Sequence, residues 1–197
     1  MTALLPQRLA GGYRHPRAAF RAERAGDPPE SRLLFYVVLA CLVIFAARLP
    51  VLTRAVPPGL EAAALPTWFG GLFVANVIFA PLMLYGLAAL SHLGSRLFGG
   101  RGTWKDARLA LFWALLLAAP LVVVVNAAET VLGLGGTVVG TVLEVLPLPA
   151  FLWFWAVFLD EVEGFGAPFA VCAALLAVPL GMAGLTRLLA LIGGASA

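Results

Sequence analysis

The polar side chains that could do chemistry in this chain are few, and several lie within or beside long apolar stretches. Asn126, Glu129 and Glu144 fall in or near two of these stretches. A carboxylate at membrane depth usually binds an ion, relays a proton or pairs with a cation, because an isolated charge in hydrocarbon is costly. We therefore consider Asn126, Glu129 and Glu144 as a candidate ion or proton site. The alternative interpretation is that both glutamates are hydrated residues near helix ends.

A second group of charged side chains lies where apolar stretches begin and end. Arg108 begins one stretch, while Asp160 and Glu161 end another. If both positions lie at the same membrane face, an Arg–carboxylate pair would neutralise charges that sit close to lipid. The sequence therefore predicts an inner-face ion pair between Arg108 and Asp160 or Glu161.

The sequence lacks the common motifs for catalysis, metal binding and cofactor binding. There is no HExxH zinc motif, no phosphate-binding P-loop and no GxSxG nucleophile motif. The glycine-rich run 132–136 lacks the strand and helix that a dinucleotide site requires. His92 has no second His or Cys beside it, and Cys41 and Cys172 lie inside apolar stretches as small hydrophobic side chains. We expect no enzymatic activity, no catalytic residue, no metal and no cofactor.

The composition determines which elements carry these residues. The 197-residue chain is 62% hydrophobic and only 12% charged, against about 45–50% and about 25% in soluble domains. Its apolar residues form five stretches whose lengths suit a hydrocarbon layer about 30 Å thick. The predicted fold class is therefore all-α, a polytopic membrane helix bundle with five transmembrane helices. The spans are expected at about 33–52, 68–90, 109–126, 142–159 and 167–189.

The chain divides into a basic N-terminal tail, residues 1–32, and a membrane domain, residues 33–192. Arg14, Arg17, Arg21 and Arg24 recur at a spacing that places them on one face if the tail is helical. The tail could then lie as a basic helix on an anionic leaflet. The other interpretation is a disordered tail that carries orientation charge.

The stretch 127–141 is apolar, rich in glycine and carries Glu129. Its pattern leaves three alternatives open. It could be an interfacial loop, a re-entrant turn or the beginning of the fourth span.

Charge placement predicts the orientation. Ten of the thirteen Lys and Arg residues fall within Arg8–Arg32 and Arg96–Arg108, and cytoplasmic loops of membrane proteins carry the excess of these residues. The N-terminus is therefore expected in the cytoplasm and, after five spans, the C-terminus outside, with a bacterial inner membrane as the expected location. Because the basic residues flank apolar spans, no nucleic-acid partner is expected. The expected partners are membrane lipids, with an anionic leaflet at the N-terminal arginines, and further copies of the chain.

Two local passages are similar to the Yip1-domain family, in particular its small bacterial members. The first is the basic turn 99–103, which leads through Asp106 and Arg108 into a span that contains Trp113 and Pro120. The second includes Trp155, Glu161, Gly164 and Phe165. The resemblance covers most of residues 33–190.

The resemblance implies a five-helix integral membrane protein without known catalysis. Eukaryotic members act in vesicle trafficking and bind small GTPases and one another, a role that has no direct bacterial counterpart. Three functions remain in view. The first is a non-enzymatic membrane scaffold that acts through helix and lipid contacts. The second is a small transporter or ion-coupled permease subunit that uses Glu129 and Glu144, and the third is a membrane enzyme, for which no motif is present.

Overall fold

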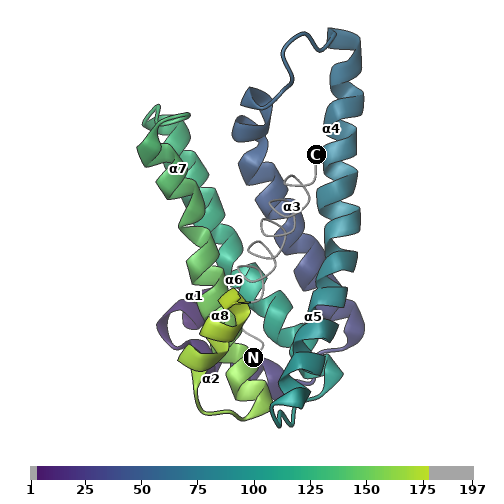
Figure 1. Ribbon diagram of the computed structural model, residues 1–197, viewed down its shortest axis with the longest axis vertical. Helices are drawn as coiled ribbons and strands as arrows, with labels where there is room; N and C mark the ends of the chain where they lie inside the picture. Colours follow the sequence, from purple (N-terminus) through teal and green to yellow (C-terminus); the bar gives the residue numbers. More distant parts are fainter. Residues whose placement is uncertain (1–3, 178–197) are drawn as a thin grey trace, which may run out of the picture.

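The computed structural model describes residues 4–177, and this part of the chain is built from helices and turns without a β-strand (Figure 1). Four helical segments are long and apolar enough to cross a membrane: Glu30–Arg54, Ala62–Leu97, Trp104–Val131 and Val138–Glu163. This architecture confirms the predicted all-α membrane bundle. Of the expected fifth span, 167–189, the structure describes a short apolar helix, Pro168–Ala177, and the remainder lies outside the described residues.

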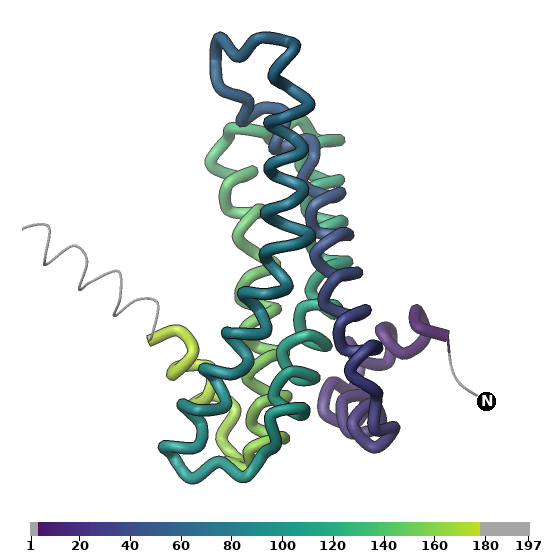
Figure 2. Tube along the Cα trace, turned by 90° about the vertical axis from the view of Figure 1, so that its right-hand side faces the viewer, coloured from purple at the N-terminus to yellow at the C-terminus, as the bar shows by residue number. Residues whose placement is uncertain are grey.

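The N-terminal tail forms two helices, α1 (Leu5–Arg14) and α2 (Pro16–Ala25). They are separated at His15, whose backbone is not helical, and the following proline favours this break because it disfavours the helical conformation of the residue before it. Pro16 then begins α2, where its missing N–H group costs nothing. Figure 2 shows both helices beside one end of the bundle. The tail is therefore helical, but the break at His15 places Arg14 on α1 and the other three arginines on α2, so the four do not share one helix face as predicted.

The first two long segments are α3 (Glu30–Arg54) and a composite helix. The composite begins with the 3₁₀ turn η1 (Ala62–Ala64) and continues through α4 (Leu65–Phe73), the π-helical η2 (Val74–Phe79) and α5 (Ala80–Leu97). The π-helical turn ends at Phe79, two residues before Pro81, whose ring disturbs the hydrogen bonding of the turn before it. A π-turn accommodates such a disturbance without ending the helix.

The other two segments are α6 (Trp104–Val131) and the pair α7 (Val138–Val145) and α8 (Pro147–Glu163). The hydroxyl of Thr103 accepts a hydrogen bond from the Asp106 N–H and caps α6, and Thr137 caps α7 in the same way. The stretch 127–141, whose structure the sequence left open, is divided among three elements. Helix α6 continues to Val131, a short turn follows at 132–137, and α7 begins at Val138.

Helix α6 lies in the centre of the bundle and packs against α3, α5 and α8. One of its faces carries small residues at helical spacing, and all are buried: Ala107, Ala110, Ala114 and Ala118. Small side chains let neighbouring helix backbones approach closely, which is how helices associate in lipid, where no hydrophobic driving force acts between them. Larger buried side chains such as Phe112, Trp113 and Leu117 fill the remaining space.

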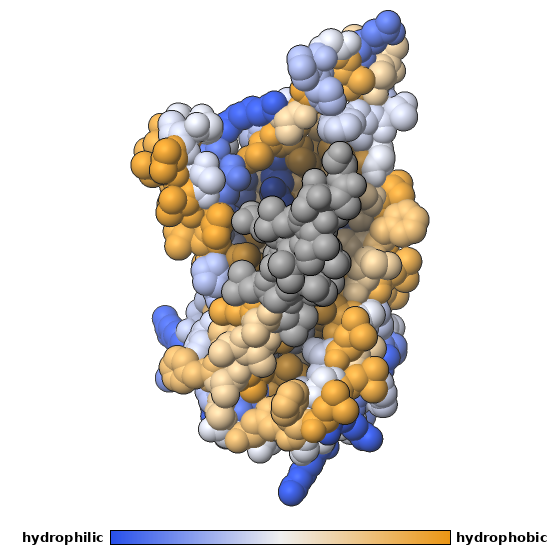
Figure 3. All heavy atoms as spheres, viewed as in Figure 1, coloured by the Kyte–Doolittle hydropathy of each residue, from blue (hydrophilic) through white to orange (hydrophobic). Residues whose placement is uncertain are grey.

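The outer surface is apolar as well. Leu82, Met83 and Leu90 of α5 are exposed, and hydrophobic side chains cover much of the α4–α5 side of the molecule (Figure 3). We call the end that holds α2, the turn 98–103 and the last turn of α8 the proximal end. The opposite end, with the loop 55–61 and the turn 132–137, is the distal end (Figure 1).

Candidate functional site

The proximal end is held together by ion pairs between α2 and the bundle, which we call the α2 ion-pair row. Three arginines of α2 each contact a carboxylate at 2.7–2.8 Å: Arg17 with Asp160, Arg21 with Glu161, and Arg24 with Asp106. Between them, Phe20 is completely buried and stacks on Phe158 with the ring centroids 4.7 Å apart. The row therefore combines an apolar anchor with surrounding charge pairs.

Asp160 has a second structural function in this row. Its side chain is only 2% exposed, and besides its contact with Arg17 it accepts a hydrogen bond from the Ala167 N–H at 2.8 Å. Helix α8 ends nearby at Glu163, and the next residue, Gly164, adopts the left-handed conformation (φ 78°) that favours glycine. Asp160 thus fixes the chain where it leaves α8, and Arg17 supplies the charge that a buried carboxylate needs.

Arg21 and Glu161 form a two-pronged contact, in which Nε and one terminal nitrogen of Arg21 donate to the two carboxylate oxygens at 2.7 and 2.8 Å. The hydrogen bond and the charge of Glu161 raise the pKa of the Arg21 guanidinium above its ordinary value. The arginine therefore stays charged throughout the usual pH range.

The sequence analysis expected Arg108 to pair with Asp160 or Glu161. The structure does not bring Arg108 to either carboxylate. Arg108 contacts Glu30 at 3.2 Å and lies 5.9 Å from the ring centroid of Tyr85. Its side chain therefore points toward α3 and α5, whereas the carboxylates at the end of α8 are covered by α2. The sequence does not show this choice of partner, because it depends on where α2 folds back.

A buried pair, His92 and Glu163, joins α5 to the end of α8. The two side chains are 0% and 1% exposed, and His92 Nδ1 lies 2.7 Å from Glu163 Oε1. The Gly102 N–H donates to Oε2 at 2.9 Å, and the Arg101 N–H donates to the main-chain carbonyl of Glu163. Trp104 packs its ring edge-on against the imidazole. The pair therefore holds the turn between α5 and α6 against α8.

Two glycines make this close approach feasible. A Cβ atom at Gly100 would collide with Glu163, and one at Gly102 would collide with Val162 and Glu163. Sequence reasoning treated His92 only as a lone residue and missed its partner. The glycines in the following turn 99–102 were the available sign that another element packs closely there. Among the described residues no group of three or more His, Cys, Asp or Glu side chains could hold a metal ion.

Among the described residues, the distal candidates Asn126, Glu129 and Glu144 make no hydrogen bond with one another. Glu129 is 1% exposed and accepts a hydrogen bond from Arg54 at 2.9 Å, which ties the end of α3 to the end of α6. The amide nitrogen of Asn126 donates to the Val122 carbonyl of its own helix, and Glu144 is exposed. The sequence analysis did not anticipate Arg54 as the partner of Glu129.

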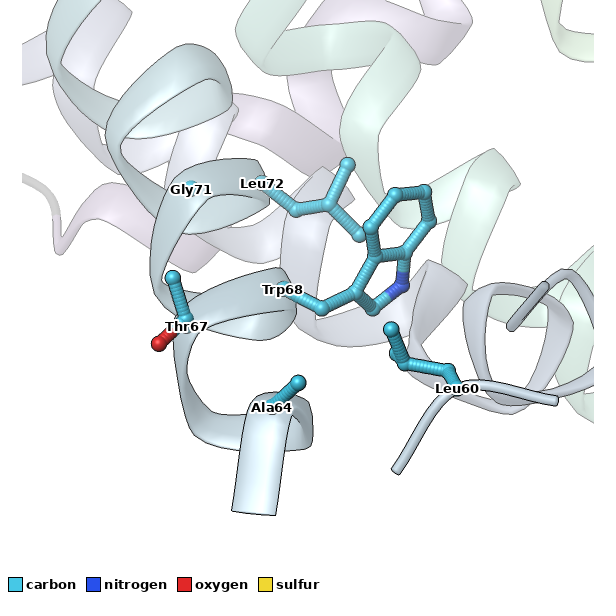
Figure 4. A pocket seen from close by; sticks show the side chains of 6 residues that line it. All are labelled: Leu60, Ala64, Thr67, Trp68, Gly71 and Leu72. Carbon is cyan, nitrogen blue, oxygen red and sulfur yellow. The ribbon is translucent and has the colours of Figure 1, made fainter. Parts of the chain in front are cut away.

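The turn 132–137 packs directly on this distal ion pair. A Cβ atom at Gly135 would collide with the Arg54 guanidinium, so the backbone of the turn lies against it. Near the same end, a shallow apolar hollow opens between the loop before α4 and α4 itself, beneath the indole of Trp68 (Figure 4). No charged group lines it, and its residues are Leu60, Ala64, Thr67, Trp68, Gly71 and Leu72.

These features define a polytopic helical membrane protein whose charged side chains are joined mainly to one another across helices. The chain matches the Yip1 domain over residues 11–192 and belongs to the Yip1 family. No curated protein and no solved structure matches it significantly. Since the family match begins within α1, it includes the α2 ion-pair row as well as the His92–Glu163 pair.

Proposed function

We propose that this Yip1-family protein is a non-enzymatic membrane scaffold that acts through helix and lipid contacts and associates with further copies of itself. The observation that carries this proposal is the engagement of the buried charges within the protein. Asp160, Glu163 and Glu129 each contact a basic side chain of another helix. Such cross-helix pairs stabilise one arrangement of the bundle, which suits a fixed platform.

A transporter would need polar groups that converge on a cavity at mid-membrane. Glu129 is instead paired with Arg54 beside the distal turn, and Glu144 is exposed near the beginning of α7. No contact among the described residues joins these two glutamates, so the structure does not favour the transporter hypothesis.

The proposed setting is a bacterial inner membrane with the proximal end in the cytoplasm. Both segments that carry the excess of Lys and Arg, Arg8–Arg32 and Arg96–Arg108, belong to this end of the bundle. The positive-inside rule then places the N-terminus in the cytoplasm. A single cysteine introduced at Glu61, in a chain whose Cys41 and Cys172 are replaced by alanine, should react with an impermeant maleimide added outside the cell. A cysteine at Arg14 should react only after permeabilisation.

The scaffold proposal is tested with the full chain reconstituted in vesicles that hold donor- and acceptor-labelled copies. We expect energy transfer above that of randomly distributed labels at every lipid dilution, and proton and cation flux equal to that of empty vesicles. Flux that Glu129→Gln abolishes would establish the transporter instead. Energy transfer that follows random distribution would contradict self-association.

A further inference from the structure

The arginines of the proximal end fall into two groups with different surroundings. Those of the α2 ion-pair row are occupied by carboxylates, so they are poorly placed to attract an anionic leaflet. Others are exposed and make no ion pair with another described residue: Arg14, Arg32, Arg96 and Arg101. Two of these are neighbours in the chain: Arg96 lies in the last turn of α5, and Arg101 lies in the turn 98–103 that follows.

That turn continues the lipid-facing surface of α5. Leu90, Leu93 and Leu97 recur on one face of the helix, and all three are exposed. Exposure is greatest where the helix ends, at 85% for Leu97 and 82% for Phe98. A contiguous patch of large exposed apolar side chains marks a surface that contacts a membrane or a protein partner. Arg96 and Arg101 therefore lie where an apolar surface meets the polar end of the protein.

The backbone that carries these residues is held in place. The N–H groups of Arg101 and Gly102 donate to Glu163, and the Gly100 N–H donates to the Ser95 carbonyl at 2.9 Å. Gly99 takes the left-handed conformation (φ 85°) that reverses the chain. Since the buried His92–Glu163 pair anchors the turn, the two arginines extend from a fixed base.

We infer that Arg96 and Arg101 form a binding site for the phosphate group of an anionic phospholipid, whose acyl chains lie along the Leu90–Leu97 face of α5. A guanidinium group binds phosphate through paired N–H donors and is weakly hydrated, which suits the headgroup region. The inference rests on the proposed membrane setting of the proximal end. An acidic protein partner would satisfy the arginines, but it would leave Leu97 and Phe98 without an apolar environment.

Trp104 provides the reporter, because it follows the turn directly and its side chain is 47% exposed. The full chain is reconstituted in phosphatidylcholine vesicles with either brominated phosphatidylglycerol or brominated phosphatidylcholine, whose bromines quench nearby tryptophan. The difference between the wild type and Trp104→Phe isolates the signal of Trp104. We expect the wild type to prefer the anionic lipid, and Arg96→Gln/Arg101→Gln to lower the relative affinity about fivefold for each arginine removed.

Two matched variants separate a local site from general attraction. Arg14→Gln/Arg32→Gln removes the same charge from exposed, unpaired positions and should retain the preference. Arg96→Lys/Arg101→Lys keeps the charge but loses the paired N–H donors, so its preference should lie between those of the wild type and Arg96→Gln/Arg101→Gln. A retained preference also shows that substitution at the turn leaves the protein folded. An equal loss in both glutamine variants would overturn the local site, as would an unchanged preference in Arg96→Gln/Arg101→Gln. Inorganic phosphate should lower the preference no more than potassium chloride of equal ionic strength, and a larger effect would show a free-phosphate site instead.

The outcomes of the lipid-preference experiment do not depend on self-association or on ion flux. Vesicles that show random energy transfer but a clear lipid preference would refute the scaffold and retain the lipid site. The reverse result would retain the scaffold and refute the site.

Discussion

The two ends of the bundle use ion pairs in different ways. At the proximal end, three arginines of one helix contact carboxylates of two others around a buried aromatic pair, and a second, fully buried pair lies behind them. At the distal end the charged side chains of α3 and α6 are joined by one pair, Arg54 with Glu129. The proximal end is therefore the more highly connected one. Charge in this protein therefore serves mainly to fix helix ends, and it does so to different degrees at the proximal and distal ends.

The largest effect is expected from Glu163→Ala at the proximal end. The substitution leaves His92 Nδ1 and the Gly102 N–H without their partner in a buried site. We expect the free energy of unfolding to fall by about 3 kcal/mol, since each unsatisfied buried polar group costs roughly 1–3 kcal/mol. Denaturation with sodium dodecyl sulfate in mixed micelles, followed by circular dichroism, measures it. Glu61→Ala, at an exposed glutamate of the distal loop, is the control and should change little.

The next effect concerns Phe20, which anchors α2 on Phe158. Phe20→Ala should cost about 2–3 kcal/mol, less than a typical buried Phe→Ala substitution, because α2 can detach while the four long helices remain packed. Trypsin should then cleave at Arg21 or Arg24 many times faster than in the wild type. Phe35→Ala, at an exposed aromatic residue of α3, should leave the cleavage rate unchanged. Equal protection of α2 in both variants would show that Phe20 is not its anchor.

At the distal end, Glu129→Ala should have a smaller effect than Glu163→Ala. Its partner Arg54 is 44% exposed in its side chain, so the guanidinium can be hydrated once the carboxylate is removed. We expect a loss of about 1 kcal/mol, after allowing for solvent screening of the pair, in the same denaturation assay. A loss as large as that of Glu163→Ala would remove the contrast between the two ends.

The smallest effect is expected from Arg21→Gln, because this arginine is the most exposed of the α2 ion-pair row. High salt should weaken its contact with Glu161 by screening. Because this contact raises the pKa of Arg21 in the folded state, it stabilises the fold at every pH below the ordinary pKa of arginine. The contribution disappears only when the pH rises through the higher pKa of the folded state. Trypsin protection of α2 should therefore depend slightly on salt, and its pH dependence between neutral and mildly alkaline conditions should not change in Arg21→Gln.

Sequence patterns predicted the helices better than the contacts between them. The apolar stretches around Leu33, Leu109 and Trp155 identified long spans, because a continuous apolar segment in hydrocarbon satisfies its backbone groups within itself only as a helix. The boundaries moved outward where capping residues extend the helices: Thr103 caps α6 and Thr137 caps α7. A hydropathy pattern does not register these local hydrogen bonds.

The candidate sites could be predicted only in part. For Glu129 the sequence left an ion or proton site and a hydrated residue as alternatives, and it placed Asp160 only at the end of a span. The partners Arg54 of Glu129 and Arg17 of Asp160 lie 75 and 143 residues away in the chain. No local pattern links residues at such separations. His92 illustrates the same limit, because its carboxylate partner is 71 residues away at the end of α8.

The sequence by itself determined that this protein consists of helices in a lipid environment, because its long apolar stretches are more stable in hydrocarbon than in water. It also determined which segments carry the excess of positive charge. Only the tertiary structure decided which charges neutralise one another, since that depends on how α2 folds across the end of α8 and how closely glycine lets the turn at 99–102 approach Glu163. Periodicity along a helix does not encode these distances.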